Sequence, residues 1–396
     1  MKHLKIIFRT FLLLSAVVLT TQKAYANNDN RVEYFDSVEV SLLTCQPHDE
    51  VYSLYGHTAL RWHDLHQETE SDIAFNWGIF NFKAPFFVIR FVFGLTDYEL
   101  GGIPYRYFQE EYRRFGSLVT EQVLNLTSQE KAKLKEALNE NLRPENRIYR
   151  YNYFYNNCTT KARDIIEKSI DGKLEYTDRK EYTPSYREMV HSMTQNNPWS
   201  RFGNDILLGI KADFRTTRAQ QEFLPGNLLY DFDHAQIYAD GNYRPLVKER
   251  RIAVPAGVQM IQEGFPVTPH SCCLILLAVS VVIFLMEYCL KRVFIWWDVT
   301  LMLLTSIIGI VLTLMIFSQH PTVNLNLQII LFNPLPLFYL WPVIRHRDTR
   351  YWQITAILAV LFLIGMFFQH YAEGIYILAL CLLLQSYANW KLKVQK

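Results

Sequence analysis

The last third of the chain carries repeated apolar runs, and this feature limits the fold more than any other. From about residue 271 there are runs of roughly 20 apolar residues, each able to cross a hydrocarbon core about 30 Å thick. Pro334, Pro336 and Pro342 interrupt the third run, but neighbouring helices can satisfy the backbone groups that a proline frees. We therefore predict an all-α membrane domain at residues 271–396 with about five spans: 272–290, 296–317, 327–344, 352–368 and 371–387.

Basic residues indicate which connections face the cytoplasm. They follow the first, third and fifth predicted spans, whereas residues 318–326 and 369–374 contain no Lys or Arg. Because Lys and Arg mark the cytoplasmic side, we expect a cytoplasmic C-terminus and an exported region before the first span. An even number of spans would break this agreement. The residues concerned are Lys291, Arg292, Arg345, Arg347, Arg350, Lys391, Lys393 and Lys396.

The first 26 residues have the pattern of a secretory signal peptide. Lys2, Lys5 and Arg9 precede an apolar run, and the small residues Ala24 and Ala26 follow it. We expect cleavage after Ala26, with an uncleaved signal anchor as the alternative. The signal and the basic loops both place residues 27–270 outside the cytoplasm.

Residues 27–270 are long enough for one domain with its own core. Alternating apolar residues predict strands at 38–44, 53–62 and 72–82. Thr127 and Glu130 form a capping box for a helix that ends near Leu142, and Asn157 is a good cap for a second helix. The domain is therefore predicted to be α+β. A net charge of +2 favours neither nucleic acid nor an acidic substrate as a partner.

The segment 85–94, with the sequence PFFVIRFVFG, is rich in phenylalanine and is joined by nearby Phe82. One interpretation is a core segment. The other is an interfacial anchor or the wall of an acyl-chain site, because such surfaces enter the headgroup region of a bilayer.

Cys158 lies in the first turn of the second predicted helix. The positive end of the helix dipole and the free N–H groups there favour a thiolate, which needs a nearby base to act as a nucleophile. His57 is a candidate base, because Gly56 before it allows close approach of a backbone or substrate. The alternatives are a hydrogen-bonded structural histidine, and a core thiol or a disulfide between Cys158 and Cys45. No helical ligand spacing indicates a metal site, and no cofactor is expected.

Four stretches of the sequence resemble known families. The order of YGHTALR and, about a hundred residues later, YNNCTT resembles circularly permuted papain-like (NlpC-like) enzymes, in which a histidine strand precedes an Asn-Cys helix. Together with FNWGIFNF and, in the membrane part, HPTVNLNLQIILFNPLP, these stretches look like the Lnb-type lipoprotein N-acyltransferases of the bacterial envelope. The resemblance covers nearly the whole mature chain.

The resemblance implies a thiol acyltransferase. The family is known for transferring an acyl chain to the N-terminal amine of lipid-modified lipoproteins at the outer face of the inner membrane. By this resemblance Cys158 is the nucleophile and His57 the base. Asn76 is the candidate for orienting the imidazole, in competition with Asp72 and His63.

The expected partners are diacylated lipoproteins and a phospholipid acyl donor, for a multi-span inner-membrane protein with a periplasmic catalytic domain. His320, Asn324 and Asn326, in an outward-facing connection, are candidates for binding polar headgroups, with capping of span ends as the alternative. The competing function is a membrane-tethered papain-like peptidase or amidase that acts on the cell wall. A further alternative is a non-catalytic envelope module.

Overall fold

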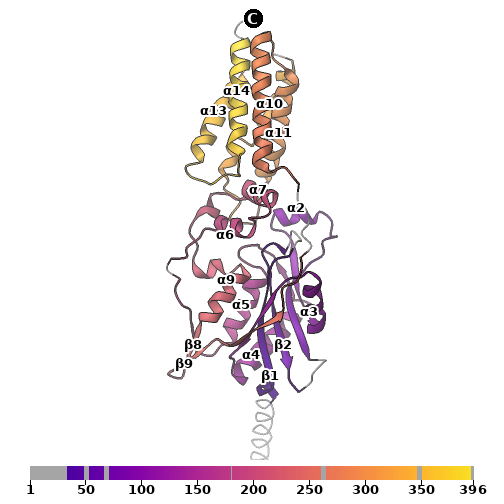
Figure 1. Cartoon of the computed structure of the whole chain (residues 1–396), viewed down its shortest axis with the longest axis vertical. Helices are drawn as coiled ribbons and strands as arrows, with labels where there is room; N and C mark the ends of the chain where they lie inside the picture. Colours follow the sequence, from indigo (N-terminus) through magenta and orange to yellow (C-terminus); the bar gives the residue numbers. More distant parts are fainter. Residues whose placement is uncertain are drawn as a thin grey trace, which may run out of the picture.

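The structure is a computed structural model that describes residues 34–393 except 49–52, 67–70, 180, 260–264 and 346–349. The predicted signal peptide lies outside the described residues. The molecule is elongated: an α+β domain stands at one end, a helical bundle at the other, and α6 and α7 lie between them (Figure 1).

The α+β domain is built on a seven-stranded antiparallel sheet with the order β10-β5-β1-β2-β3-β4-β6. The three predicted strands are present, but the second begins at His57, since Gly56 has a positive φ and closes a turn onto Ser53. The strands are β1 Val38–Cys45, β2 His57–Asp64, β3 Asp72–Ile79, β4 Asp97–Pro104, β5 Val119–Leu124, β6 Ile148–Arg150 and β10 Val247–Val254.

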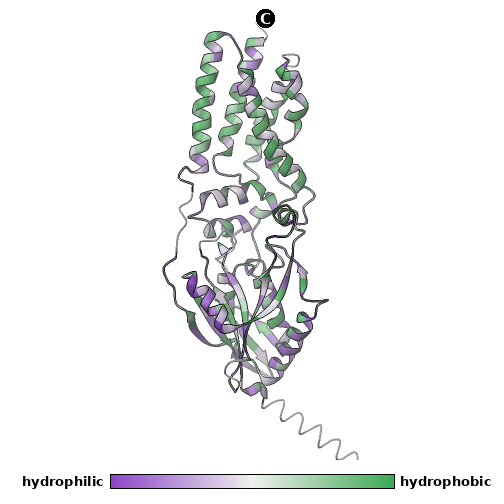
Figure 2. Ribbon diagram, turned by 90° about the vertical axis from the view of Figure 1, so that its right-hand side faces the viewer, coloured by the Kyte–Doolittle hydropathy of each residue, from purple (hydrophilic) through white to green (hydrophobic). Residues whose placement is uncertain are grey.

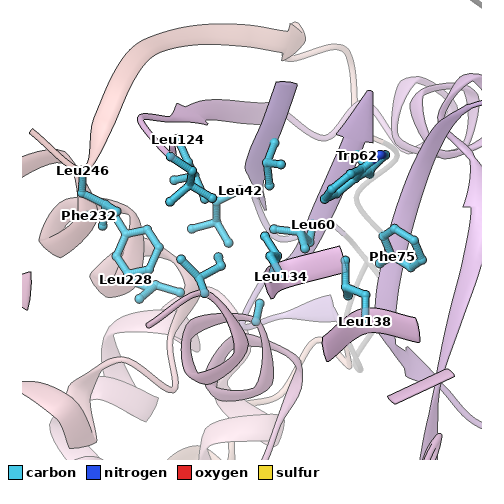
Figure 3. Close-up of a cluster of buried hydrophobic side chains, with 14 of the residues drawn as sticks. Leu42, Leu60, Trp62, Phe75, Leu124, Leu134, Leu138, Leu228, Phe232 and Leu246 are labelled. Carbon is cyan, nitrogen blue, oxygen red and sulfur yellow. The ribbon is translucent and has the colours of Figure 1, made fainter. Parts of the chain in front are cut away.

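Helices cover both faces of this sheet. Even-numbered residues of β1, such as Leu42, join the main core under α4 (Ser128–Leu142) and α5 (Cys158–Ser169), whereas Leu43 faces α3 (Tyr105–Arg114). This is the two-residue period of a strand. Figure 3 shows strand residues meeting Leu134 and Leu138 of α4. Each buried leucine contributes about 1.5–3 kcal/mol through the hydrophobic effect.

Both predicted helix caps are present. Thr127 and Glu130 form a capping box at α4, and the side chain of Asn157 accepts hydrogen bonds from two N–H groups of α5. Ala162 and Ile166 of α5 are fully buried.

A mainly helical segment follows α5 and includes a three-stranded sheet with the order β7-β8-β9. Its elements are β7 Lys173–Glu175, α6 Tyr186–Met193, α7 Pro198–Leu207, η2 Ile210–Asp213, α8 Arg218–Gln221, α9 Pro225–His234, β8 Gln236–Ala239 and β9 Asn242–Pro245. The short helix α2, Phe87–Val92, is part of the earlier phenylalanine-rich segment.

The C-terminal part is helical and strongly apolar (Figure 2). Within the described residues, four segments are long and apolar enough to span a membrane, and α13 is shorter, with 16 residues. The third predicted span is divided into a 3₁₀ turn and α12, with Pro334 capping the helix. The elements are α10 Pro269–Leu290, α11 Ile295–Met315, η3 Leu327–Ile330, α12 Leu335–Ile344, α13 Arg350–Gly365 and α14 Ile375–Lys393.

Backbone hydrogen bonds join the two parts of the molecule. The N–H of Gly209 donates to the carbonyl of Thr322 at 2.8 Å, and the N–H of Ile210 donates to the carbonyl of Leu325 at 2.9 Å. Beneath this junction Arg187 is buried and binds Asp205 and Asp213, each at 2.7 Å. The connection between α11 and η3 is therefore held directly against the segment after α7.

Candidate active site

His57 is oriented by Asn76 on the neighbouring strand. The Nε2 atom of His57 lies 2.8 Å from Oδ1 of Asn76, and the N–H of Gly78 donates to the same oxygen at 2.6 Å. Because Oδ1 accepts the Gly78 bond, the imidazole donates from Nε2, and Nδ1 is free to act as a base. The pairing of β3 with β4 shifts register between Asn76 and Ile79, a β-bulge of the kind that redirects side chains.

Cys158 is the first residue of α5. The Asn157 side chain accepts from the N–H groups of Thr159 and Thr160, both at 3.0 Å, and therefore fixes the start of the helix. No acceptor for the N–H of Cys158 itself is present among the described residues. This N–H is available to bind a developing negative charge.

His57 and Cys158 contact each other, and each stabilises the charged form of the other. Burial opposes ionisation of the thiol, but His57 outweighs it, helped by the Thr58 N–H and the Thr159 hydroxyl, and the pKa of Cys158 falls to about 7. Burial lowers the pKa of His57, but the thiolate and the bond to Asn76 outweigh it, so that the pKa of His57 is raised. The arrangement favours a thiolate–imidazolium pair.

The pair lines a cavity of about 630 Å³, which is within the usual size range of small-molecule sites. Asn76, Glu111 and Phe223 also line it. A second cavity of about 570 Å³ shares part of its lining with the first and extends towards the membrane part. Its lining is mainly aromatic and aliphatic.

The two competitors of Asn76 have other partners. Asp72 forms two hydrogen bonds with Arg61, both at 2.8 Å, and His63 lies 3.4 Å from the same guanidinium. Neither contacts His57 through a hydrogen bond within the described part of the chain.

Cys45 lies opposite His57 in the pairing of β1 with β2, but its thiol is not bonded to Cys158. Both are free cysteines in the structure. Cys45 is buried beside Tyr112 on the α3 side of the sheet, and burial raises the pKa of its thiol. Cys45 and Cys158 therefore have opposite tendencies to ionise.

The three predicted headgroup residues lie in the connection after α11. His320 lines the second cavity and its Nε2 donates to the carbonyl of Phe91 at 3.0 Å. The Asn326 amide donates to the carbonyl of Ile206 at 2.7 Å, while its oxygen accepts from the N–H of Gln328 at 3.0 Å. The oxygen of Asn324 is buried and has no partner among the described residues. Their role in substrate binding stays a prediction.

Several contributors to the site could not be found from sequence motifs. Glu111 on α3 and the N–H of Thr58 reach the pair only through the packing of the sheet. Gly78 was visible in FNWGIFNF, but its contact with the imidazole depends on the bulge. Among the described residues no group of three His, Cys, Asp or Glu side chains could hold a metal ion.

Comparison with protein families matches both parts of the chain. Residues 25–203 match the model described as the Lnb N-terminal periplasmic domain, and residues 261–396 match the Lnb transmembrane domain. The chain belongs to the Lnb family. This Lnb protein is a lipoprotein N-acyltransferase-like membrane protein with a periplasmic domain and an α+β fold, as the sequence predicted. Searches of curated proteins and of solved structures find no match.

Proposed function

We propose that this Lnb protein transfers an acyl chain from a phospholipid to the N-terminal amine of diacylated lipoproteins. Cys158 is the nucleophile, His57 the general base and Asn76 the residue that orients His57. The contact between His57 and Cys158, in a cavity large enough for a substrate, carries this proposal. Family membership supports the acyltransferase class.

The first half of the reaction forms a thioester. The Cys158 thiolate attacks the ester carbonyl of the phospholipid, and the carbon–oxygen bond to glycerol breaks. The His57 imidazolium donates its proton to the leaving alkoxide, so that a lysophospholipid departs. The N–H of Cys158 is positioned to stabilise the oxyanion of the tetrahedral intermediate.

The second half forms the amide. The uncharged amine of the lipoprotein attacks the thioester carbonyl, the carbon–sulfur bond breaks, and neutral His57 accepts the proton lost by nitrogen. The products are the N-acylated lipoprotein and the original thiolate–imidazolium pair. Neither half requires an oxidant, a reductant or a metal ion.

The architecture suits two lipid substrates. Both would be anchored in the outer leaflet of the inner membrane, and the α+β domain is joined to the membrane part by backbone hydrogen bonds. Holding two reactants near one site replaces an encounter in solution with a local reaction. A cell-wall peptidase could use the same catalytic pair, but it would need only one membrane anchor.

Mass spectrometry of the N-terminus of a reporter lipoprotein tests the proposal. In cells whose N-acylation depends on this protein, Cys158→Ser and His57→Ala should each reduce N-acylation by at least about a thousandfold. Cys289→Ser is a matched control, because that cysteine is exposed on α10 and away from the catalytic cavity. Undiminished acylation by either site variant, in membranes containing normal amounts of protein, refutes the assignment.

A further inference from the structure

The second cavity lies between the catalytic cavity and the membrane part. It has a volume of about 570 Å³ and shares six lining residues with the catalytic cavity: Tyr55, Phe80, Phe82, Tyr98, Tyr151 and Tyr153. Most of its other lining residues come from α2, α6, α7, the end of α11 and the connection that follows α11. The two cavities therefore adjoin at these six aromatic side chains.

The wall formed by α2 is fixed to the membrane part. The hydroxyl of Ser318 donates to the carbonyl of Val92 at 2.9 Å, and the N–H of Gln319 donates to the carbonyl of Phe93 at 3.0 Å. These bonds place α2 at the level where α11 ends, beside α7 (Figure 1). Phe82 and Val88 line the cavity and are more than half exposed, so that the cavity opens at this level.

The chemistry of the lining favours a hydrocarbon chain over a charged headgroup. No Asp, Glu, Lys or Arg is present among its described lining residues. His320 is the one imidazole there, and burial lowers its pKa, which keeps the ring neutral. A phosphate in this cavity would lose its water without meeting a cation, whereas an acyl chain gains from burial.

We propose that the second cavity binds the acyl chain that is attached to Cys158 during transfer, and that Val92 and Leu207 limit the length of this chain. This inference rests on the proposed acyl transfer and adds the selection of the chain to it. Val92 lines the cavity from α2 and Leu207 from α7, and both side chains are partly buried. Neither lines the catalytic cavity. Substitutions there should change which acyl chain is transferred.

The test measures which chain the full-length protein transfers. The protein is reconstituted in vesicles that contain equal amounts of dilauroyl, dimyristoyl, dipalmitoyl and distearoyl phosphatidylethanolamine. A diacylated lipopeptide is added, and mass spectrometry measures the amount of each N-acyl product. Burial of each methylene favours binding by about fourfold. We therefore expect Val92→Trp and Leu207→Trp to reduce the ratio of stearoyl to lauroyl product by at least about tenfold.

Ile89→Trp is the matched control, since Ile89 is on the same short helix as Val92 but is exposed and does not line the cavity. Its product ratio should equal that of the unmodified protein. If a tryptophan variant does not fold, Val92→Ala and Leu207→Ala test the proposal instead. Because these variants enlarge the cavity, they should raise the ratio of stearoyl to lauroyl product.

The outcomes separate the two proposals. An unchanged product ratio in the folded cavity variants, with normal transfer by the unmodified protein, overturns the chain site and leaves the acyltransferase intact. A change in Ile89→Trp equal to that in Val92→Trp also overturns it, because the effect would then not depend on the cavity. Absence of transfer by the unmodified protein overturns both.

Discussion

At the scale of single residues, the main property of the site is the lowered pKa of the Cys158 thiol. Its pKa falls from an ordinary value of 9.0 to about 7 because the effects of His57, Thr58 and Thr159 outweigh the opposing effect of burial. A pKa near the working pH provides thiolate for attack and still gives a good leaving group for the second step.

The pH dependence of thiol alkylation should show this directly. Iodoacetamide reacts with the thiolate, so the labelling rate of Cys158 should rise with pH through a midpoint near 7. In His57→Ala the burial that raises the thiol pKa is retained while the main opposing contribution is lost. Its midpoint should therefore move upward, above the ordinary value of 9.0. Mass spectrometry of the Cys158 peptide follows the rate, and equal midpoints in the two proteins would contradict the charge pair.

At the scale of elements, β3 places Gly78 close to both His57 and Asn76. A Cβ atom placed on Gly78 would lie 2.7 Å from Cε1 of His57 and 2.9 Å from Oδ1 of Asn76. Real Cβ atoms do not approach other atoms so closely, so any side chain at residue 78 must displace the imidazole, its partner or the strand.

Gly78→Ala should therefore reduce acyl transfer by about 10²-fold, because small misplacements of catalytic groups have effects of this size. Gly203→Ala is the matched control. Among the described residues, no atom beyond its chain neighbours and the backbone of its own helix lies within 4 Å of the added Cβ, and alanine favours helix α7 by about 0.5–1 kcal/mol. Transfer by the Gly203 variant should be unchanged. Equal activities of the two variants, measured with the same reporter lipoprotein, would show that the close packing at Gly78 is not required.

Local sequence patterns predicted much of the element structure. The caps at Thr127 and Asn157 depend on neighbouring residues, and both are present as expected. The strand beginning at residue 53 was predicted too early, because apolar alternation does not reveal the positive φ of Gly56. Family resemblance was needed to predict that His57 and Cys158 act together, because the two residues lie on elements about a hundred residues apart.

The second cavity could not be predicted from the sequence. Its walls come from α2, α6, α7 and the connection after α11, which meet only in the folded chain. The phenylalanine-rich segment left two interpretations open. No side chain of α2 is buried, which contradicts the core segment, and the interfacial anchor or acyl-chain wall stays a prediction. Phe87 and Phe91 line the cavity, whereas Phe86 and Ile89 are exposed.

At the scale of the whole molecule, Arg187 stabilises the junction of the two parts. Its guanidinium is buried between Asp205 and Asp213, and it also donates to the carbonyl of Leu208 at 3.0 Å. The carbonyl of Asp205 accepts from Gln328 at 2.8 Å, so the ion-pair cluster is connected to the membrane part.

Arg187→Ala should destabilise the protein by about 3–5 kcal/mol, because it leaves buried carboxylates without their cation. Arg147→Ala removes a more exposed ion pair with Glu99 and should change stability by less than about 1 kcal/mol. Thermal unfolding in detergent micelles compares the two variants. Similar small losses would indicate that the junction does not depend on the buried cation.

The close packing at Gly209 restricts how the two parts of the molecule can meet at the junction. A Cβ there would lie 2.1 Å from the carbonyl oxygen of Leu325, and the N–H groups of Gly209 and Ile210 donate to the carbonyls of Thr322 and Leu325. These contacts join the α+β domain, which carries the Cys158 thiol, to the membrane part. In the reaction proposed above, such a junction would favour an amine that is anchored in the membrane by its own lipid over the amine of a freely diffusing peptide.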